Sequence, residues 1–563
     1  MILITTHDAR ALRLAPAPHQ TLAQAIFLYR EDGQAGLWDG VPLCAGLGKC
    51  GLCRVRYLSA PPAPAAEELR RLGTEAVAKG WRLSCLHKAE PCEIELPEPR
   101  RSARPRAVIS GLASGIPTGG SAALGTITSG PAALAATLAV DLGTTSIHWA
   151  ALNAAGEILS SGQGLNPQLG LGSEVMSRLA FAARPGGAAV LQGLALERLR
   201  HLVSGAEQTH GARVTRLCAA GNSAMTTLLL GLPTDGLARA PYHLDYAGGD
   251  VRPLAPDLPE ALIPPLLAPF VGADLSAGLA ALHFALGGPP AYPYLLADLG
   301  TNGEFVLALS AEQYLLASVP MGPALEGVGL RHGRVAAPGA VRAFVLTPVG
   351  LRPEYVERPP LPGPEGKHED AGITGVGYLS LAALLRRAGV LDESGRFVVP
   401  ASPLATPLAR RLARGLKSLA GSGGQDGIGG EQALDLGGGL LLPASDVEEL
   451  VKVKAAFNLA LSRLLAEAGL APGALTAVLL AGAMGEHVDP RDLASLGFLP
   501  EALTGRVRAV GNTSLAGAGL LLTRSEAWDW VRDLPGKCRV LDLAAEPEFG
   551  HLYVQRMVLR HVS

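Results

Sequence analysis

The sequence predicts an α/β protein with a small α+β domain at its N-terminus, and three observations carry this prediction. From residue 134 onward, apolar strand-like runs alternate with helical runs, as in a layered α/β domain. The tetrapeptide Asp-Leu-Gly-Thr occurs twice, at residues 141–144 and 298–301, each time between two apolar runs. Five of the seven cysteines lie between residues 44 and 92, inside a short opening segment.

Length and composition exclude several classes of protein. The chain has 563 residues, enough for three or four domains of about 150 residues each. Its formal net charge of −2 argues against a basic nucleic-acid-binding surface or a polybasic membrane patch. No signal peptide opens the chain, and residues 275–297, which lack Asp, Glu, Lys and Arg, are interrupted by Gly-Gly-Pro-Pro. We therefore expect a cytoplasmic protein with no membrane or nucleic-acid partner.

The first domain is predicted to occupy residues 1–97. An apolar run at the start indicates a first strand, and residues 92–96 indicate a last one. Residues 98–133 are rich in Arg, Pro, Ala, Gly and Ser without a sustained period, which predicts a flexible linker. The large domain then spans residues 134–563. Within it, residues 352–367, rich in Pro, and 421–439, rich in Gly, are expected to be surface loops.

Four cysteines have the spacing of an iron–sulfur site. Cys44, Cys50 and Cys53 lie in one glycine-containing loop, and Cys85 follows after 31 further residues. Iron–sulfur clusters need thiolates that converge from such a loop and from a distant residue, and glycine lets backbone N–H groups approach the sulfides. Structural zinc is the alternative, but zinc sites usually have two Cys-x2-Cys pairs. The pattern resembles an adrenodoxin-like 2Fe–2S ferredoxin, and Cys92, on what is predicted to be an edge strand, is expected to be a spare thiol.

The two Asp-Leu-Gly-Thr copies indicate a pair of phosphate-binding hairpins. Each copy joins two strands: residues 138–140 to 147–152, and residues 295–297 to 305–309. Such a turn points backbone N–H groups and Thr hydroxyls at phosphate oxygens, and the adjacent Asp holds Mg²⁺, usually through water. The candidate residues are Asp141 and Asp298 for Mg²⁺ and catalysis and, for the phosphates, Gly143, Thr144, Thr145, Gly300, Thr301, Asn302 and Glu304.

A third element follows much later in the chain. Residues 478–485 run from an apolar strand into small residues, whose backbone can lie against the flat face of an adenosine. Gly482 and Gly485 are the candidates for that contact. Residues 510–514 then open a helical run over 515–522, another strand–loop–helix junction. Each of these elements alone is typical of ordinary turns, whereas the ordered set indicates an ATP site.

The order of two phosphate hairpins and an adenosine loop resembles the acetate and sugar kinase, Hsp70 and actin superfamily, which implies two ribonuclease-H-like lobes around a cleft. Combined with the cysteines, the chain resembles the reductive activators of corrinoid proteins, in which a β-grasp 2Fe–2S ferredoxin domain precedes an ATPase of this superfamily. Because only residues 98–133 separate the two domains, the family's separate middle domain is predicted to be missing here. Other matching stretches are residues 166–168, 174–178, 322–327, 372–377 and 511–514.

This resemblance implies an ATP-hydrolysing reductase. Its 2Fe–2S cluster would pass one electron to the Co(II) of a corrinoid protein or cobalamin-dependent methyltransferase, giving Co(I). An upstream electron donor is also implied, and a homodimer is left open. Two alternatives remain: an ATP-gated redox sensor or binding protein, and a small-molecule phosphotransferase, for which no motif supplies a general-base Asp. Activators of radical dehydratases carry a 4Fe–4S cluster at a dimer interface and no ferredoxin domain, so the four cysteines argue against that class.

Overall fold

The structure is a computed structural model of the chain. It describes residues 1–562 except residues 18, 31–35, 39, 40, 42, 45, 47, 49, 100–133, 286, 337, 348, 349, 358–371, 399–405, 420–430 and 483–487. The predicted flexible linker over residues 98–133 therefore lies almost entirely outside the described residues, and so does Gly485.

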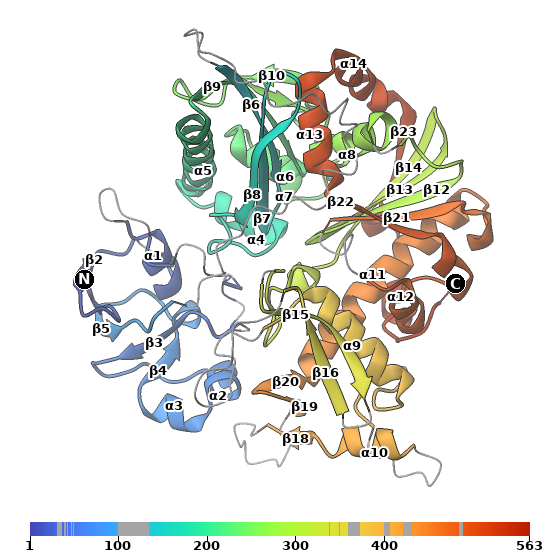
Figure 1. Cartoon of the computed structure of the whole chain (residues 1–563). Helices are drawn as coiled ribbons and strands as arrows, with labels where there is room; N and C mark the ends of the chain where they lie inside the picture. The colour runs from blue at the N-terminus through green and yellow to red at the C-terminus, as the bar shows by residue number, and fades with distance from the viewer. Residues whose placement is uncertain are drawn as a thin grey trace, which may run out of the picture.

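The N-terminal domain is built on one five-stranded mixed sheet, with strand order β2-β1-β5-β3-β4 (Figure 1). Ile2 and Ile4 of β1 point into its core, and helix α1 (Leu22–Leu28) begins with a capping box formed by Thr21 and Gln24. Pairing of β1 with β5 is parallel, so β5 is a central strand; the prediction that Cys92 lies on an edge strand is wrong. The strands are β1 (Ile2–Thr5), β2 (Ala11–Leu14), β3 (Arg54–Tyr57), β4 (Trp81–Leu83) and β5 (Cys92–Glu95).

The large domain has two lobes, each built on a six-stranded sheet (Figure 1). The first sheet has the order β10-β11-β9-β6-β7-β8 and the second β22-β21-β12-β13-β14-β23. The strands of the first are β6 (Leu134–Leu142), β7 (Ser146–Leu152), β8 (Ile158–Leu165), β9 (Ala212–Gly221), β10 (Asp250–Arg252) and β11 (Ala261–Ile263). Those of the second are β12 (Tyr294–Leu299), β13 (Asn302–Ser310), β14 (Gln313–Pro320), β21 (Ala477–Gly482), β22 (Val507–Gly511) and β23 (Cys538–Leu541).

Two helices pack against each other between the sheets: α8 (Ala273–Phe284) and α13 (Thr513–Thr523) (Figure 1). Both are almost wholly apolar, so they bury surface on all sides and join the two lobes through one continuous core. The uncharged residues 275–297, which Gly-Gly-Pro-Pro interrupts, contain most of α8 and the start of β12. Helix α5 (Gly187–His210) covers the outer face of the first sheet.

The second lobe carries additional strands and helices beyond its central sheet. They include β15 (Ala340–Thr347), β16 (Gly350–Tyr355), α9 (Gly375–Arg387), β19 (Gln432–Gly437) and α11 (Ala444–Glu467). Strand β16 ends within the first stretch expected to be a loop, and β19 lies within the second, so that expectation is wrong in part. The reason is antiparallel pairing: β19 pairs with β18 (Leu416–Ser418) and β20 (Leu440–Pro443), and only two buried side chains, Ala433 and Leu434, are needed to anchor it.

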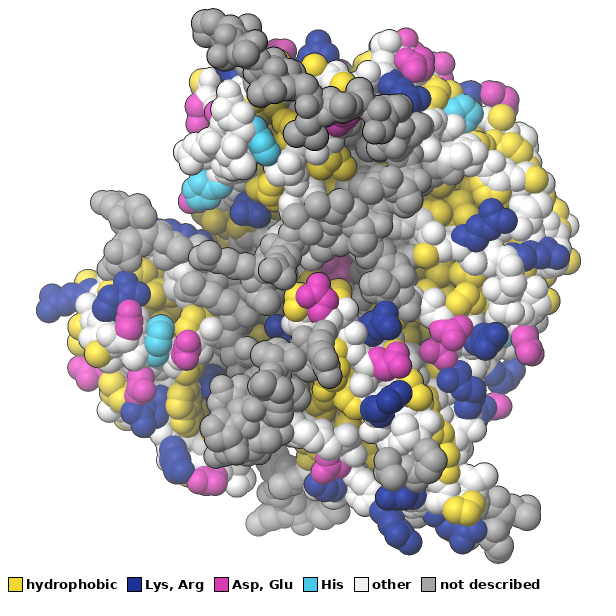
Figure 2. Space-filling view, viewed as in Figure 1, with side chains coloured by type: hydrophobic (Ala, Val, Ile, Leu, Met, Phe, Trp, Pro, Cys, Tyr) yellow, Lys and Arg dark blue, Asp and Glu magenta, His cyan; other side chains and the backbone are white. Residues whose placement is uncertain are grey.

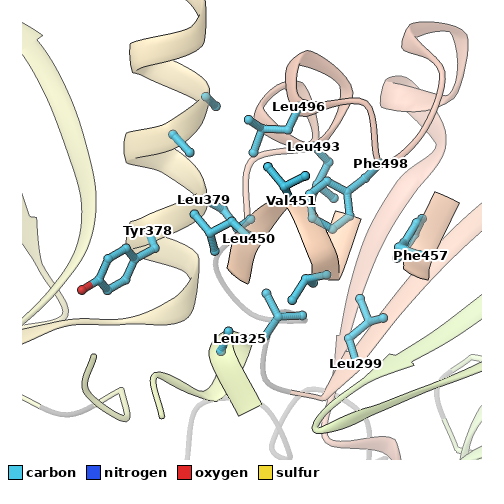
Figure 3. Packing of buried hydrophobic residues seen from close by; sticks show 14 of the residues in the cluster. Leu299, Leu325, Tyr378, Leu379, Leu450, Val451, Phe457, Leu493, Leu496 and Phe498 are labelled. Carbon is cyan, nitrogen blue, oxygen red and sulfur yellow. The ribbon is translucent and has the colours of Figure 1, made fainter. Parts of the chain in front are cut away.

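Helix α11 forms the centre of the second lobe's core. The Phe457 ring is fully buried and packs edge-to-face against Phe305 at 5.2 Å and Phe498 at 5.5 Å between ring centroids. Figure 3 shows Phe457 and Phe498 among their apolar neighbours. The lobe therefore depends on an aromatic cluster shared by β13, α11 and the segment after α12 (Pro490–Leu496).

We expect Phe457→Ala to lower the free energy of unfolding by about 3–5 kcal/mol, because it removes buried aromatic surface and leaves a cavity. Urea unfolding followed by circular dichroism would measure the loss. Val554→Ala is the matched control, since Val554 is 64% exposed and its truncation should change stability by less than about 0.5 kcal/mol. Equal effects of the two substitutions would contradict this assignment of the core.

Two features of the structure relate to nucleic-acid and membrane binding: the charges on the surface, and the length and composition of the helices. On the face shown in Figure 2, Lys and Arg side chains are interspersed with Asp and Glu side chains over the large domain. Within the described ranges, no single helix is both long and apolar enough to cross a membrane. One bent pair, Val175–Ala182 with Gly187–His210, passes by length and composition alone.

Candidate functional site

Both predicted hairpins are present at the inner ends of the two sheets. In the first, β6 and β7 pair antiparallel with Asp141 opposite His148. In the second, β12 and β13 pair with Asp298 opposite Glu304. Each Asp therefore stands at the end of a buried strand, immediately before the Gly/Thr turn, which confirms the repeated Asp-Leu-Gly-Thr motif as a repeated structure.

The two turns meet across the lobes. The hydroxyls of Thr145 and Thr301 lie 2.8 Å apart, in hydrogen-bond contact, and both side chains are buried. Thr144 accepts a hydrogen bond of 2.8 Å from Asn222, which also caps helix α6 (Ser223–Leu229). The structure thus brings the predicted phosphate-binding residues of both hairpins to one place.

A buried arginine supports the first turn from behind. Arg178 of helix α4 (Val175–Ala182) is fully buried and donates to the carbonyl oxygens of Thr144 and, at 2.8 Å, Gly172. Burial lowers the pKa of Arg178 to about 9. Its hydrogen bonds fix the backbone of the turn, so the N–H groups of the turn keep one orientation.

The first aspartate is held by the junction found at residues 510–514. Asn512 Nδ2 and Ser514 Oγ donate to the two carboxylate oxygens of Asp141 at 2.7 and 3.1 Å. The Asn512 side chain also accepts from the Leu515 N–H and so caps α13. Asp141 of the first lobe is therefore oriented by the end of a strand of the second sheet.

Carboxylates gather around the hairpins closely enough to raise one another's pKa. Burial, followed by the charges of Asp274 and Asp141, raises the pKa of Asp298 to about 8. Burial and Asp141 raise the pKa of Asp274 to about 7, and burial with Asp274 and Asp298 raises that of Glu304. Neighbouring carboxylates resist ionising together unless positive charge is present, and oxygen donors of this kind are ligands of Mg²⁺.

Two acidic residues of this site are not among the predicted site residues, although Glu326 lies in the matching stretch 322–327. Asp274 lies in the first turn of α8, and Glu326 ends a short 3-10 helix, Pro323–Glu326. Glu326 accepts hydrogen bonds from Thr301 Oγ1 at 2.8 Å and from Ser146 Oγ at 3.4 Å. A signal existed for Asp274, because it is the single charged residue directly before the uncharged stretch 275–297.

The predicted adenosine element is described only up to Gly482. Strand β21 runs parallel to β12, with Gly482 beside Leu299. Gly482 has φ +74°, and a Cβ at this position would lie 2.5 Å from Asp298 Oδ1, so only glycine fits. The predicted strand is confirmed, whereas the rest of the loop, with Gly485, lies outside the described residues.

The four predicted ligand cysteines share one cavity in the N-terminal domain. Cys44, Cys50, Cys53 and Cys85 line a space of about 210 Å³. The Cys50 N–H donates to Cys44 Sγ at 3.4 Å. The glycines of the cysteine loop adopt positive φ, as backbone approach to sulfur requires: Gly46 (101°), Gly48 (68°) and Gly51 (70°).

Contacts between the thiols raise the pKa of two of them. A hydrogen bond with Cys44 and then burial raise the pKa of Cys50, and a hydrogen bond with Cys85 and then burial raise that of Cys53. Cys92 does not line the cavity. In the described part of the chain, no group of three or more His, Cys, Asp or Glu side chains is arranged to hold a metal ion.

The cysteine cavity faces the large domain. Gly170 and Arg184 of the first lobe complete its lining. A Cβ at Gly170 would lie 2.4 Å from the ring of Phe27 of α1, so glycine permits the close approach of the two domains. The molecule thus contains two candidate sites: the converging thiols of the N-terminal domain and the paired hairpins of the two lobes.

Two lobes with a phosphate-type hairpin at the inner end of each sheet define an ATP-binding protein of the actin, Hsp70 and sugar kinase class. Comparison with known families agrees. Residues 293–563 match the model described as the C-terminal domain of RACo, the ASKHA domain, and residues 136–286 match the RACo middle region. The chain belongs to this family, the reductive activators of corrinoid proteins.

Individual relatives support the same assignment. The chain is 28% identical over 446 residues to the corrinoid activation enzyme RamQ of Eubacterium limosum, covering 74% of this chain and 69% of that protein. It is 28% identical over 311 residues to the [Co(II) methylated amine-specific corrinoid protein] reductase of Methanosarcina barkeri, covering 52% and 51%. A solved structure named reductive activator for corrinoid, iron-sulfur protein shares the fold, with a TM-score of 0.64, 22% identity and coverage of 100% and 98%.

One expectation about the domains needs correction. The prediction that the family's middle domain is missing is wrong as far as the matched middle region is concerned, because residues 136–286 match it. These residues form the sheet and helices of the first lobe, including the first hairpin. The middle region is thus one of the two lobes of the ATP-binding domain, and its six-stranded sheet repeats that of the second lobe.

Proposed function

We propose that this chain is an ATP-dependent reductase that returns an inactive Co(II) corrinoid protein to Co(I). The observation that carries the proposal is the pairing of the two sites: a cavity lined by four cysteines opens against the first lobe of an ATP-binding domain. The names of the two curated relatives, a corrinoid activation enzyme and a Co(II) corrinoid protein reductase, support this choice of reaction.

The four cysteines fit a 2Fe–2S cluster better than a single metal ion. Three come from one glycine-containing loop, where N–H groups of Cys50 and Leu52 already point at Cys44 and Cys50 sulfurs at 3.4 and 3.5 Å. Backbone donors of this kind stabilise the negative charge of cluster sulfurs. When bound, the cluster would supply a one-electron carrier; the thiols would hold it at the face of the domain that meets the first lobe.

The hairpins would hold MgATP. Turn N–H groups and the hydroxyls of Thr144, Thr145 and Thr301 are the donors for the phosphates, and Asp141 and Asp298 orient Mg²⁺. Energy from ATP is needed when the potential of the electron donor lies above that of the Co(II)/Co(I) couple. A gap of ~100 mV makes the transfer of one electron unfavourable by about 2.3 kcal/mol. Closing of the lobes on nucleotide would provide two states with different affinity for the Co(II) partner.

Anaerobic spectroscopy tests the proposal. A methylated-amine corrinoid protein in the Co(II) state should convert to Co(I) only when the full chain, a reductant and MgATP are all present. Added Co(II) protein should also raise the rate of ATP hydrolysis, because a partner that prefers one lobe state shifts the equilibrium between the states.

Other outcomes separate the alternatives. Equal reduction rates with and without ATP, over a range of donor potentials, would contradict the proposal and leave the sensor function. Transfer of phosphate to a small molecule, without corrinoid reduction, would support the phosphotransferase. We further propose that the protein acts in the cytoplasm with a separate upstream electron donor.

A further inference from the structure

Glu326 holds the hydroxyls that the phosphates of a nucleotide would need. One carboxylate oxygen accepts from Thr301 Oγ1 at 2.8 Å, and the other faces Ser146 Oγ at 3.4 Å. Thr301 belongs to the turn of the second hairpin, and Ser146 follows the turn of the first. A single carboxyl group therefore bridges both hairpins, in the place where the phosphates are expected; burial raises the pKa of Glu326, and its hydrogen bonds with Thr301 and Ser146 lower it.

An anion in this position competes with phosphate. Hydroxyls of such turns are donors to phosphate oxygens, and one hydroxyl hydrogen cannot be donated to two acceptors at once. The site is already crowded with negative groups, since Asp298 and Glu304 both feel the charge of Glu326. Phosphates entering between the hairpins would therefore push the Glu326 carboxylate away from its two donors.

The segment after Glu326 leads directly to the N-terminal domain. Five residues further on, the Arg331 N–H donates to both carboxylate oxygens of Asp446 at 3.1 and 2.9 Å. The Arg331 carbonyl oxygen accepts from Arg71 Nη2 at 3.1 Å, and the same Nη2 donates to the Cys50 carbonyl oxygen at 2.9 Å. Arg71 thus ties the cysteine loop to the backbone that carries Glu326.

The reach of this segment is short. Five residues span at most about 18 Å when fully extended, so Glu326 and Arg331 stay within that distance of each other. Gly327, the next residue, has φ +74°, and a Cβ there would lie 2.2 Å from the Arg334 carbonyl oxygen. The segment is therefore folded tightly back on itself, and its two ends are mechanically connected.

We propose that Glu326 is the positioning residue through which nucleotide binding reaches the N-terminal domain: the phosphates displace its carboxylate, and the segment 326–331 passes this movement to the Arg71 clamp on the cysteine loop. The inference rests on the proposed function only for ATP binding and requires no corrinoid. Release of the clamp would free the cysteine loop from the backbone of the second lobe at Arg331.

Nucleotide affinity tests both ends of this connection in the full-length protein. Calorimetry with Mg²⁺ and a non-hydrolysable ATP analogue should give Glu326→Gln an affinity about tenfold above wild type, within the usual ~5–150-fold range of coupling between sites. The substitution removes the competing charge, while the Gln oxygen still accepts from Thr301. Arg71→Gln should also tighten nucleotide binding, because coupling is reciprocal and the clamp no longer has to be broken.

Arg70→Gln is the matched control for Arg71. Arg70 is the adjacent residue of the same helix, α2 (Ala66–Leu72), and pairs with Glu67 inside the N-terminal domain at 2.8 Å. Its replacement should leave nucleotide affinity at the wild-type value. Hydrogen exchange gives a second readout. In the wild-type protein, amides of α2 should exchange faster when nucleotide is bound. In Glu326→Ala, they should exchange at this faster rate even without nucleotide.

The outcomes distinguish the two proposals. Wild-type affinity in both Glu326→Gln and Arg71→Gln would overturn the inference, and so would tighter binding in Glu326→Gln alone, since the signal would then stop at the nucleotide site. Failure of corrinoid reduction would leave all of these affinities unchanged and would count only against the proposed function. Wild-type protein that does not bind the analogue would overturn both.

Discussion

Each of the substitutions Cys44→Ser, Cys50→Ser, Cys53→Ser and Cys85→Ser should yield a protein without visible colour, whereas the wild-type chain should contain about two irons and two sulfides. The expected loss is complete because the cavity supplies one thiol for each ligand position, and a hydroxyl does not replace a thiolate on iron. Iron and sulfide analysis with visible and electron paramagnetic resonance spectra, on protein purified without oxygen, would measure it.

Two other cysteines provide controls. Cys92→Ser and Cys218→Ser should keep the full spectrum, because Cys92 lies on the central strand β5 and Cys218 is fully buried in β9 of the first lobe. Stoichiometric zinc without sulfide in the wild-type protein would show that the four thiols form a structural zinc site instead. Loss of colour in Cys92→Ser as well would move one ligand position away from the predicted set.

The local parts of both sites could be predicted because short-range patterns determine them. A Gly/Thr turn between two apolar runs forms a hairpin whatever surrounds it, so Asp141 and Asp298 were found at the ends of their strands. The spacing of the cysteine loop likewise fixes which thiols can converge. The capping of α13 by Asn512 follows from the same kind of local chemistry.

The remaining parts depend on contacts between distant segments. Glu326 reaches Thr301 and Ser146 only after the two lobes have come together, and nothing near residue 326 in the sequence indicates those partners. The central place of β5 arises from parallel pairing with β1, about 90 residues away in the chain, which strand patterns alone do not specify. Asp274 belongs to this group, since its neighbours come from both hairpins.

The second large effect is expected at the hairpins. Asp141→Ala and Asp298→Ala should each lower the rate of ATP hydrolysis by about 100-fold or more, the scale seen when a group that stabilises transition-state charge is removed. Each substitution takes away a carboxylate that would orient Mg²⁺ between the turns. Phosphate release at saturating MgATP would measure the rate, and the visible spectrum should stay at its wild-type intensity because the cysteines lie in a separate domain.

The two substitutions should differ in what they leave behind. Asp141 is held by Asn512 and Ser514, so Asp141→Ala also leaves these donors without an acceptor, whereas Asp298 is surrounded mainly by other carboxylates. We therefore expect Asp141→Ala to destabilise the junction of the lobes, and Asp298→Ala to leave stability unchanged or raised. Asp257→Ala is the control, because Asp257 pairs with Arg200 at the exposed surface. This variant should hydrolyse ATP at the wild-type rate. Wild-type hydrolysis in both hairpin variants would mean that the Asp-Leu-Gly-Thr turns are structural and that other residues hold Mg²⁺.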